Sequence, residues 1–150
     1  MENLCGMTGN TYAVVDMQKI KRNVEKIKAH IGNKVTLLPV LKGSTCGHGL
    51  EEIGTFLVEQ CGIQMLCVGQ TIEAQRLRES GVTCDILVLG GTPFHNIPYV
   101  VDHDLTTTLS NLDYAHRLSD EAQRQRKRAK LPLKINSGLG RMGVCPGKEL

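Results

Sequence analysis

The residue best placed for covalent chemistry is Lys42, the last residue of the apolar stretch 35–42 (VTLLPVLK). If this stretch is a buried strand, alternation puts Leu38, Val40 and Lys42 on one face. Lys42 then lies at the carboxyl end of a strand, where α/β proteins build their active sites. A desolvated lysine there becomes nucleophilic, as Schiff-base formation with an aldehyde cofactor requires. Position alone, however, favours a strand-end lysine that extends into water.

A second group of polar residues follows in the stretch 131–136 (LPLKIN), where Lys134 and Asn136 share one face and the leucines and isoleucine share the other. Polar side chains on one face of a buried parallel strand indicate a barrel interior or a site. Arg141 comes after a glycine-rich turn and offers a rigid fork of donors for a carboxylate, phosphate or phenolate. An ordinary surface arginine explains the same position equally well.

The elements that must position these residues alternate between short apolar runs and amphipathic stretches, which is typical of βα units around a parallel sheet. We expect strands at residues 12–15, 35–42, 65–68, 85–89, around 105–109 and at 131–136, with helices between them. Asp16, Thr71 and the box 110–113 (SNLD) are the expected helix caps. A (β/α)8 barrel closes with eight strands in about 250 residues, so these elements amount to little more than half a barrel. Periodicity alone favours a doubly wound open sheet, although no G-x-G-x-x-G follows the first strand.

The composition is that of one soluble domain. The chain has 150 residues, 41% hydrophobic and 22% charged, with a net charge of +3. This balance excludes a disordered chain and requires no polyanionic partner. The six cysteines include no C-x-x-C pair, so neither a zinc site nor a disulfide scaffold is expected. With no signal peptide or membrane-length apolar stretch, we expect a cytoplasmic protein that binds no membrane.

Several ordered segments resemble the alanine racemase family. Residues 39–49 (PVLKGSTCGHG) are similar to its cofactor segment, in which a lysine is followed five residues later by Gly-His-Gly. Residues 133–144 (LKINSGLGRMGV) resemble a second segment, a lysine-bearing strand followed by Gly-x-Gly-Arg-x-Gly. Residues 11–16, 67–74 and 86–93 resemble the family in order and position. The resemblance therefore extends over nearly the whole chain.

The resemblance implies an isomerase that depends on pyridoxal 5'-phosphate (PLP) and interconverts L- and D-alanine, which supplies D-alanine for cell-wall synthesis. The chain would be the first part of an N-terminal PLP-binding (β/α)8 barrel, incomplete at its C-terminus and without the C-terminal β domain, and the complete protein would be a homodimer. Lys42 would bind PLP and act as one of two bases that exchange the α-proton. Arg141 would face the phenolic oxygen of PLP and the substrate carboxylate, and Lys134, carbamylated in some members, would help to hold Arg141.

The chain departs from the family at several of these positions. Cys46 stands where the family usually has a tyrosine that binds the cofactor phosphate, and a thiol is a shorter and weaker donor. Asn136 replaces an aspartate, and residues 43–45 (GST) replace a more typical Ala-Asn-Ala. The second catalytic base, which the resemblance implies is a tyrosine of the partner subunit, lies beyond the residues present. We expect little racemase activity from these 150 residues alone.

Three alternatives remain open. The chain is a non-catalytic PLP-binding protein of the homeostasis type, a racemase for another small amino acid such as serine, or a basic RNA-binding fragment. The last depends on the basic run 124–130 (RQRKRAK), but that run also suits a helix C-terminus and contains no aromatic residues for base stacking. Residues 102–104 (DHD) fit an exposed turn better than a metal site, because neighbouring residues of a strand face opposite ways. We therefore expect neither a metal nor a nucleic acid partner.

Overall fold

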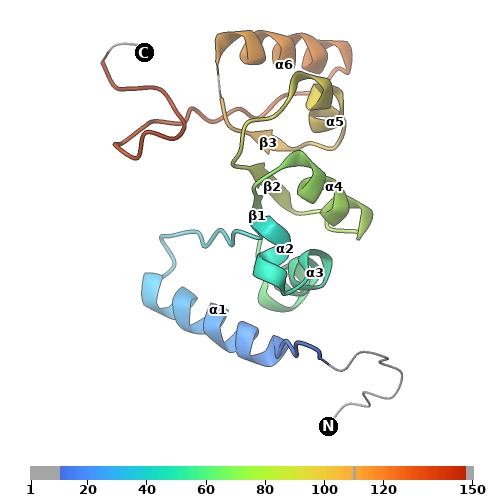
Figure 1. Ribbon diagram of the computed structural model, residues 1–150, viewed down its shortest axis with the longest axis vertical. Helices are drawn as coiled ribbons and strands as arrows, with labels where there is room; N and C mark the ends of the chain where they lie inside the picture. The colour runs from blue at the N-terminus through green and yellow to red at the C-terminus, as the bar shows by residue number, and fades with distance from the viewer. Residues whose placement is uncertain (1–10, 110, 148–150) are drawn as a thin grey trace.

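The computed structural model describes residues 11–109 and 111–147. Within them, a three-stranded parallel sheet lies beside helices that follow one another in chain order along the long axis of the molecule (Figure 1). The elements are α1 (Met17–Ile31), α2 (Lys42–Gly47), α3 (Leu50–Cys61), β1 (Met65–Val68), α4 (Thr71–Glu79), β2 (Asp85–Val88), the 3-10 helix η1 (Phe94–Asn96), α5 (Ile97–Asp102), β3 (Thr106–Thr107) and α6 (Leu112–Arg124).

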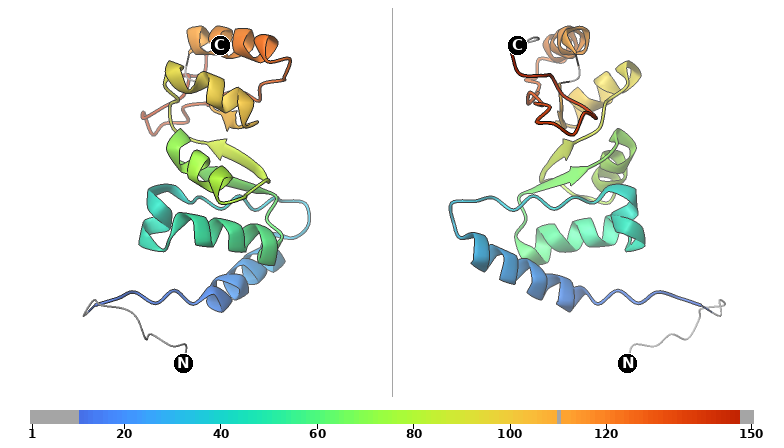
Figure 2. Two further views of the ribbon diagram at one scale, coloured as in Figure 1. Left: turned by 90° about the vertical axis from the view of Figure 1, so that its right-hand side faces the viewer. Right: turned by 60° about the vertical axis from the view of Figure 1, so that its left-hand side comes forward.

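The strands of the sheet are ordered β1-β2-β3, as they occur in the chain. β1 and β2 pair along their whole length with Val68 opposite Val88, and Val88 is opposite Thr107 of β3. Helices α3, α4 and α5 lie on the same side of these strands (Figures 1 and 2). A doubly wound sheet has helices on both faces. Consecutive parallel strands with helices on one side are instead the pattern of a (β/α) barrel.

The core lies between the sheet and these helices. α1 packs against α3, α3 against α4, and α5 against α6. The hydroxyls of Thr107 and Tyr114 hydrogen-bond inside it at 3.0 Å, so burying both polar groups leaves neither unpaired. Residues in it that are almost fully buried are Leu50, Leu66, Val68, Leu77, Ile86, Val88, Val100, Tyr114 and Leu118.

The helix ends follow the capping signals of the sequence, with one correction. Asp16 caps α1 by accepting a hydrogen bond from the Lys19 amide at 3.0 Å, as predicted. α4 is capped by Gln70, so the prediction of Thr71 as its cap is wrong, and Thr71 is the first helical residue. Asn111, inside the predicted box, caps α6, and position 110 of that box lies outside the described residues.

Three of the predicted strands are not regular strands. Residues 12–15 precede α1 in an extended, mostly exposed conformation, because no described segment pairs with them. The stretch 35–42 forms a single bridge, between Val40 and Cys67, and Pro39 has no N–H to extend it. The stretch 131–136 likewise makes only isolated bridges, among them Leu133 with Leu109. The strand predicted at 65–68 is confirmed as β1, the one at 85–89 ends at Val88 as β2, and the one around 105–109 is reduced to Thr106–Thr107 of β3.

Candidate functional site

Lys42 is held at the carboxyl edge of the sheet by its neighbours in the chain. The Leu41 amide donates to the Cys67 carbonyl at 2.8 Å, and the Cys67 amide donates to the Pro39 carbonyl at 2.8 Å. The buried Leu41 side chain packs into the core, whereas Val40 and Lys42 are exposed on the other face. The predicted alternation is therefore found for residues 40–42 only, because Leu37, Leu38 and Pro39 are all half-buried. The exposure of Lys42 agrees with the strand-end lysine extending into water that its position alone favours.

The segment that follows Lys42, which is labelled α2, is a left-handed turn rather than a regular helix or the end of a strand. The backbone of Gly43, Ser44, Thr45 and Cys46 has φ between 51° and 64° and ψ between 36° and 42°. Only glycine adopts this region freely, and each non-glycine residue in it costs about 1 kcal/mol or more. Such a turn persists only where its surroundings hold it.

Several hydrogen bonds hold this turn. The Thr45 amide donates to the Leu41 carbonyl at 3.0 Å, and the Thr45 hydroxyl donates to the Gly49 carbonyl at 3.1 Å. The Gly49 amide donates to the Ser44 carbonyl at 3.2 Å. The Gly-His-Gly segment thus closes the turn, and the Cys46 side chain is left exposed beside it.

A carboxylate of α4 joins the turn to the end of β1. Glu73 accepts hydrogen bonds from the amides of Gly43 at 2.7 Å, Gly69 at 2.8 Å and Gln70 at 3.0 Å. We did not predict this role from the sequence. The available signal was the spacing of Gln70 and Glu73, which is that of a capping box.

Two glycines bring the carboxyl ends of the neighbouring segments unusually close. A Cβ at Gly69 would lie 3.2 Å from the Lys42 Cβ, and a Cβ at Gly90 would lie 2.3 Å from the Gly69 carbonyl oxygen. The Gly90 amide donates to that oxygen at 3.1 Å. Lys42, Gly69 and Gly90 are therefore successive neighbours along this edge of the sheet.

Lys134 reaches the same edge from the segment after α6. Its half-buried side chain donates to the Leu89 carbonyl at 3.2 Å, one residue before Gly90. The structure thus brings the segments of Lys42 and Lys134 to one edge across the ends of β1 and β2. That edge is the carboxyl end of parallel strands, where barrel enzymes bind their substrates.

Asn136 shapes the loop that carries Arg141. Its side-chain oxygen accepts from the amides of Gly138 at 3.1 Å and Gly140 at 3.0 Å. The Asn136 amide pairs with the Val144 carbonyl at 2.9 Å, which returns the chain beside the 131–136 stretch. Arg141 lies exposed on this loop. No described contact joins it to Lys42 or Lys134.

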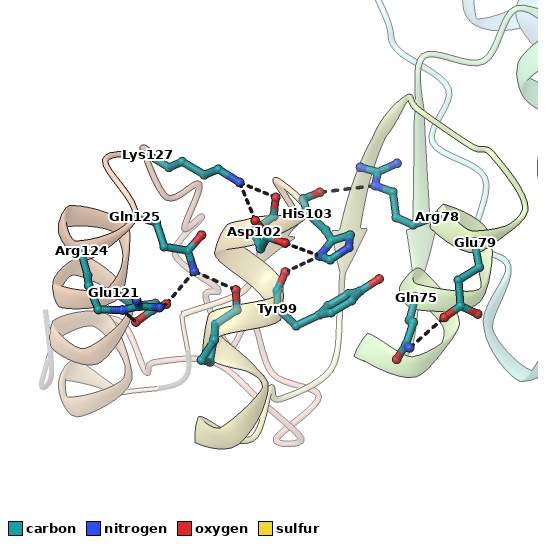
Figure 3. Close-up of polar contacts among 11 residues, drawn as sticks. Gln75, Arg78, Glu79, Tyr99, Asp102, His103, Glu121, Arg124, Gln125 and Lys127 are labelled. Carbon is teal, nitrogen blue, oxygen red and sulfur yellow. Dashed lines mark hydrogen bonds and ion pairs between the residues drawn. The ribbon is translucent and has the colours of Figure 1, made fainter.

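The other candidates have structural partners. Lys127 binds Asp102, and the amine of Lys130 lies 2.9 Å from a carboxylate oxygen of both Asp85 and Asp104. Arg124 binds Glu121 (Figure 3). The basic run is thus largely tied to acidic side chains, and the carboxylates of the 102–104 segment accept from lysines. In the described part of the chain, no cluster of His, Cys, Asp or Glu suits a metal ion, and no helix is long and apolar enough to cross a membrane.

The described cysteines are free thiols. Burial raises the pKa of Cys67 on β1, and burial likewise raises the pKa of Cys61 and Cys84. These three groups therefore stay protonated at neutral pH and act as small apolar side chains.

Comparison with known proteins identifies the family. The model for "Alanine racemase, N-terminal domain" matches residues 15–150. Alanine racemase 1 of Caldanaerobacter subterraneus subsp. tengcongensis is 40% identical over 133 residues, which cover 89% of this chain and 34% of that protein. The alanine racemase of Clostridium perfringens strain SM101 is 33% identical over 138 residues, which cover 92% of this chain and 35% of that protein.

Solved structures agree with the sequence match. The alanine racemase of Clostridium difficile 630 superposes with a TM-score of 0.80 at 30% identity, covering 87% of this chain and 34% of that one. The alanine racemase from E. faecalis superposes with a TM-score of 0.82 at 27% identity, covering 90% of this chain and 36% of that one. The chain thus spans about a third of the length of the relatives it matches. The predicted fold is confirmed as the first part of their α/β barrel, and the chain belongs to the alanine racemase family.

Proposed function

We propose that this chain is the portion of an alanine racemase that carries its PLP-binding lysine, and that this lysine is Lys42. The observation that carries the proposal is the placement of Lys42. Its amine is exposed at the carboxyl edge of the sheet, on a segment fixed by the β1 bridge on one side and the left-handed turn on the other.

The donor set of the described residues fits PLP. An aldehyde requires an accessible amine, which Lys42 provides on the uncovered face. A phenolic oxygen and a carboxylate require a guanidinium, which Arg141 provides. The phosphate is the weaker part of the fit, because Cys46 offers a thiol where the family has a phenol. Further phosphate donors belong to parts of the complete protein outside this chain.

Bound PLP draws electrons away from the Cα of an attached amino acid and so makes its proton acidic. The chain's own residues then have separate tasks. Lys42 Nζ would remove the α-proton from one face of Cα in one direction of the reaction and deliver a proton to that face in the other direction. Arg141 would orient the substrate carboxylate, and Lys134, whose amine donates to the Leu89 carbonyl, would help to hold Arg141 in the complete protein. A second base on the opposite face completes the two-base exchange and comes from a partner subunit.

The complete protein is then a cytoplasmic homodimer that converts L-alanine to D-alanine for cell-wall synthesis. In it, residues 1–150 begin a (β/α)8 barrel that precedes a β domain. The names of the relatives at 33–40% identity favour alanine over serine. The closed Gly-His-Gly turn favours a racemase over a PLP-homeostasis protein. A histidine racemase from Leuconostoc mesenteroides, at 23% identity, shares the fold and decides nothing about the substrate.

The test is the absorbance of PLP bound to lysine in the complete protein, followed by borohydride reduction and peptide mapping. We expect a visible band and a reduced adduct on the peptide that contains Lys42. Both should be absent in Lys42→Ala and unchanged in Lys34→Ala, a matched lysine on the loop after α1. A band that survives in Lys42→Ala, or an adduct on another lysine, contradicts the proposal.

Substrate and activity are tested separately. The complete protein with PLP should convert L-alanine to D-alanine faster than it converts L-serine, as measured by chiral chromatography. PLP binding without racemisation of either amino acid would favour the homeostasis alternative.

A further inference from the structure

Glu73 makes more contacts than a helix cap requires. A capping-box glutamate accepts from the backbone of its own cap residue, and Glu73 does so from the Gln70 amide. Its carboxylate also accepts from the amide of Gly69, and from that of Gly43, which lies 30 positions away in the chain. The Gly43 contact has the shortest distance of the three, 2.7 Å.

The Gly43 contact acts where the backbone changes direction. Gly43 follows Lys42 and opens the left-handed turn, at φ 64°. On the other side of Lys42, the Leu41 amide is fixed to the Cys67 carbonyl of β1. The backbone of Lys42 is thus held from both sides, by β1 and by the Glu73 carboxylate.

Gly69 contributes to the same arrangement because it has no side chain. A Cβ at this position would lie 3.2 Å from the Lys42 Cβ and 3.3 Å from a Glu73 carboxylate oxygen. The absence of a side chain at Gly69 lets the cofactor segment and the carboxylate approach the same backbone. The three residues form one connected unit.

We infer that Glu73 is a positioning residue for Lys42: its carboxylate joins the start of α4 to the left-handed turn and thereby fixes where the Lys42 amine emerges. This role rests on Lys42 being the cofactor lysine proposed above. Glu73 itself touches neither cofactor nor substrate and acts on the reaction only through Lys42. Hydrogen bonds from backbone amides to a carboxylate are among the stronger ones in proteins, which suits a link that must hold a strained turn.

The Glu73→Gln substitution separates the two arms of this link. One Glu73 oxygen accepts from Gly43, and the other accepts from both Gly69 and Gln70. A glutamine has one acceptor oxygen, and its NH2 group opposes any amide donor it faces. With its oxygen toward Gly69 and Gln70, the variant keeps the cap of α4 and loses the Gly43 arm. Glu79→Gln is the matched control, on the same helix and bound through its side chain to Gln75.

The first measurement needs no cofactor. Hydrogen exchange of the cofactor-free complete protein, followed by mass spectrometry, should show exchange in residues 42–49 at least about 10-fold faster in Glu73→Gln than in the wild type. Exchange in α4 should change little, and Glu79→Gln should match the wild type in both segments. Equal exchange of residues 42–49 in Glu73→Gln and wild type overturns the inference, whether or not PLP binds.

The second measurement follows bound PLP. In Glu73→Gln we expect weaker PLP binding, by about 10-fold, together with a smaller induced circular dichroism of the visible band, which reports how the ring is held. A role limited to stability would lower the melting temperature and leave both quantities unchanged. If the wild-type protein shows no absorbance band of lysine-bound PLP, the proposed function is refuted. If the wild type shows the band and the circular dichroism of Glu73→Gln is the same as that of the wild type, only the role of Glu73 is refuted.

Discussion

At the scale of single residues, the site depends on positions where a side chain is missing as much as on those where one is present. Lys42 supplies the amine, but Gly69 and Gly90 allow three backbone segments to meet beside it. Glu73 then satisfies three amides that this approach leaves at the edge of the sheet. A buried or crowded amide without an acceptor is costly, so the glycines and the carboxylate belong together.

Gly90 gives a sharp test of this close approach. In Gly90→Ala the new Cβ would lie 2.3 Å from the Gly69 carbonyl oxygen, a backbone atom that cannot move aside cheaply. We expect the free energy of unfolding to fall by about 1–3 kcal/mol, measured by urea denaturation. Gly91→Ala is the control, because its nearest neighbour, the Met142 methyl carbon, is 3.9 Å away. Equal stabilities of the two variants would contradict the steric argument.

At the scale of elements, polar contacts fasten the helices to one another on the surface remote from Lys42. Arg78 of α4 donates to the His103 carbonyl at 3.3 Å, and the His103 ring stacks on Tyr99 of α5 with ring centres 3.8 Å apart (Figure 3). The Lys127 amine, after α6, binds Asp102 at the end of α5 at 3.0 Å. These contacts connect α4 to α5 and α5 to the segment after α6, so they link consecutive βα units outside the sheet.

The Asp102 pair predicts a dependence of stability on acid. The hydrogen bond from Lys127 and its positive charge hold the pKa of Asp102 below its ordinary value. A carboxylate whose pKa is lower in the folded state stabilises that state above its unfolded pKa, and the effect is lost as the pH falls through the folded pKa. Asp102→Asn should therefore melt at a slightly lower temperature than the wild type at pH 7.

The two melting temperatures should converge as the pH falls below the ordinary aspartate pKa of about 3.9. Thermal unfolding followed by circular dichroism at a series of pH values gives this comparison. Lys127→Met is the matched variant, since it removes the other partner, and it should reproduce the behaviour of Asp102→Asn. A difference between wild type and Asp102→Asn that stays constant into strong acid would exclude the ion pair as its source.

At the scale of the whole molecule, helices cover one side of the sheet, and apolar side chains of the segments beside the sheet remain in contact with solvent. Val40 is 46% exposed, and Leu133 and Ile135 are each 44% exposed, all from segments beside the sheet. Val40 is on the face of Lys42, which turns inward in a closed barrel, whereas Leu133 and Ile135 are on the face opposite Lys134, which helices cover in such a barrel. The chain spans about a third of the length of the relatives that form this barrel.

A polypeptide of only these 150 residues should therefore associate. Uncovered apolar surface and open strand edges favour contacts between copies. We expect oligomers or aggregates in size-exclusion chromatography with light scattering, and strong binding of a hydrophobic dye. Leu133→Lys combined with Ile135→Lys should reduce both signals, and Lys34→Ala should leave them unchanged. A monodisperse monomer with little dye binding would contradict this expectation.

The sequence by itself determined the family, through the resemblance of several ordered segments. It also determined the βα order, three strands and most helix ends, because these depend on local spacing. Apolar periodicity, Asp16 and the Gly47–His48–Gly49 segment all act within a few residues of one another. Lys42 and Lys134 were likewise visible as the polar ends of apolar stretches. Their roles stay proposals, but their place at the carboxyl edge of the sheet agrees with the prediction.

Only the tertiary structure decided how Lys42 is held. The stretch 35–42 has the composition of a strand, yet it pairs at one residue and gives way to a left-handed turn. At the start of that turn the Gly43 amide donates to Glu73, which lies on another βα unit. Contacts between segments 30 residues apart depend on packing, and no periodicity within either segment encodes them.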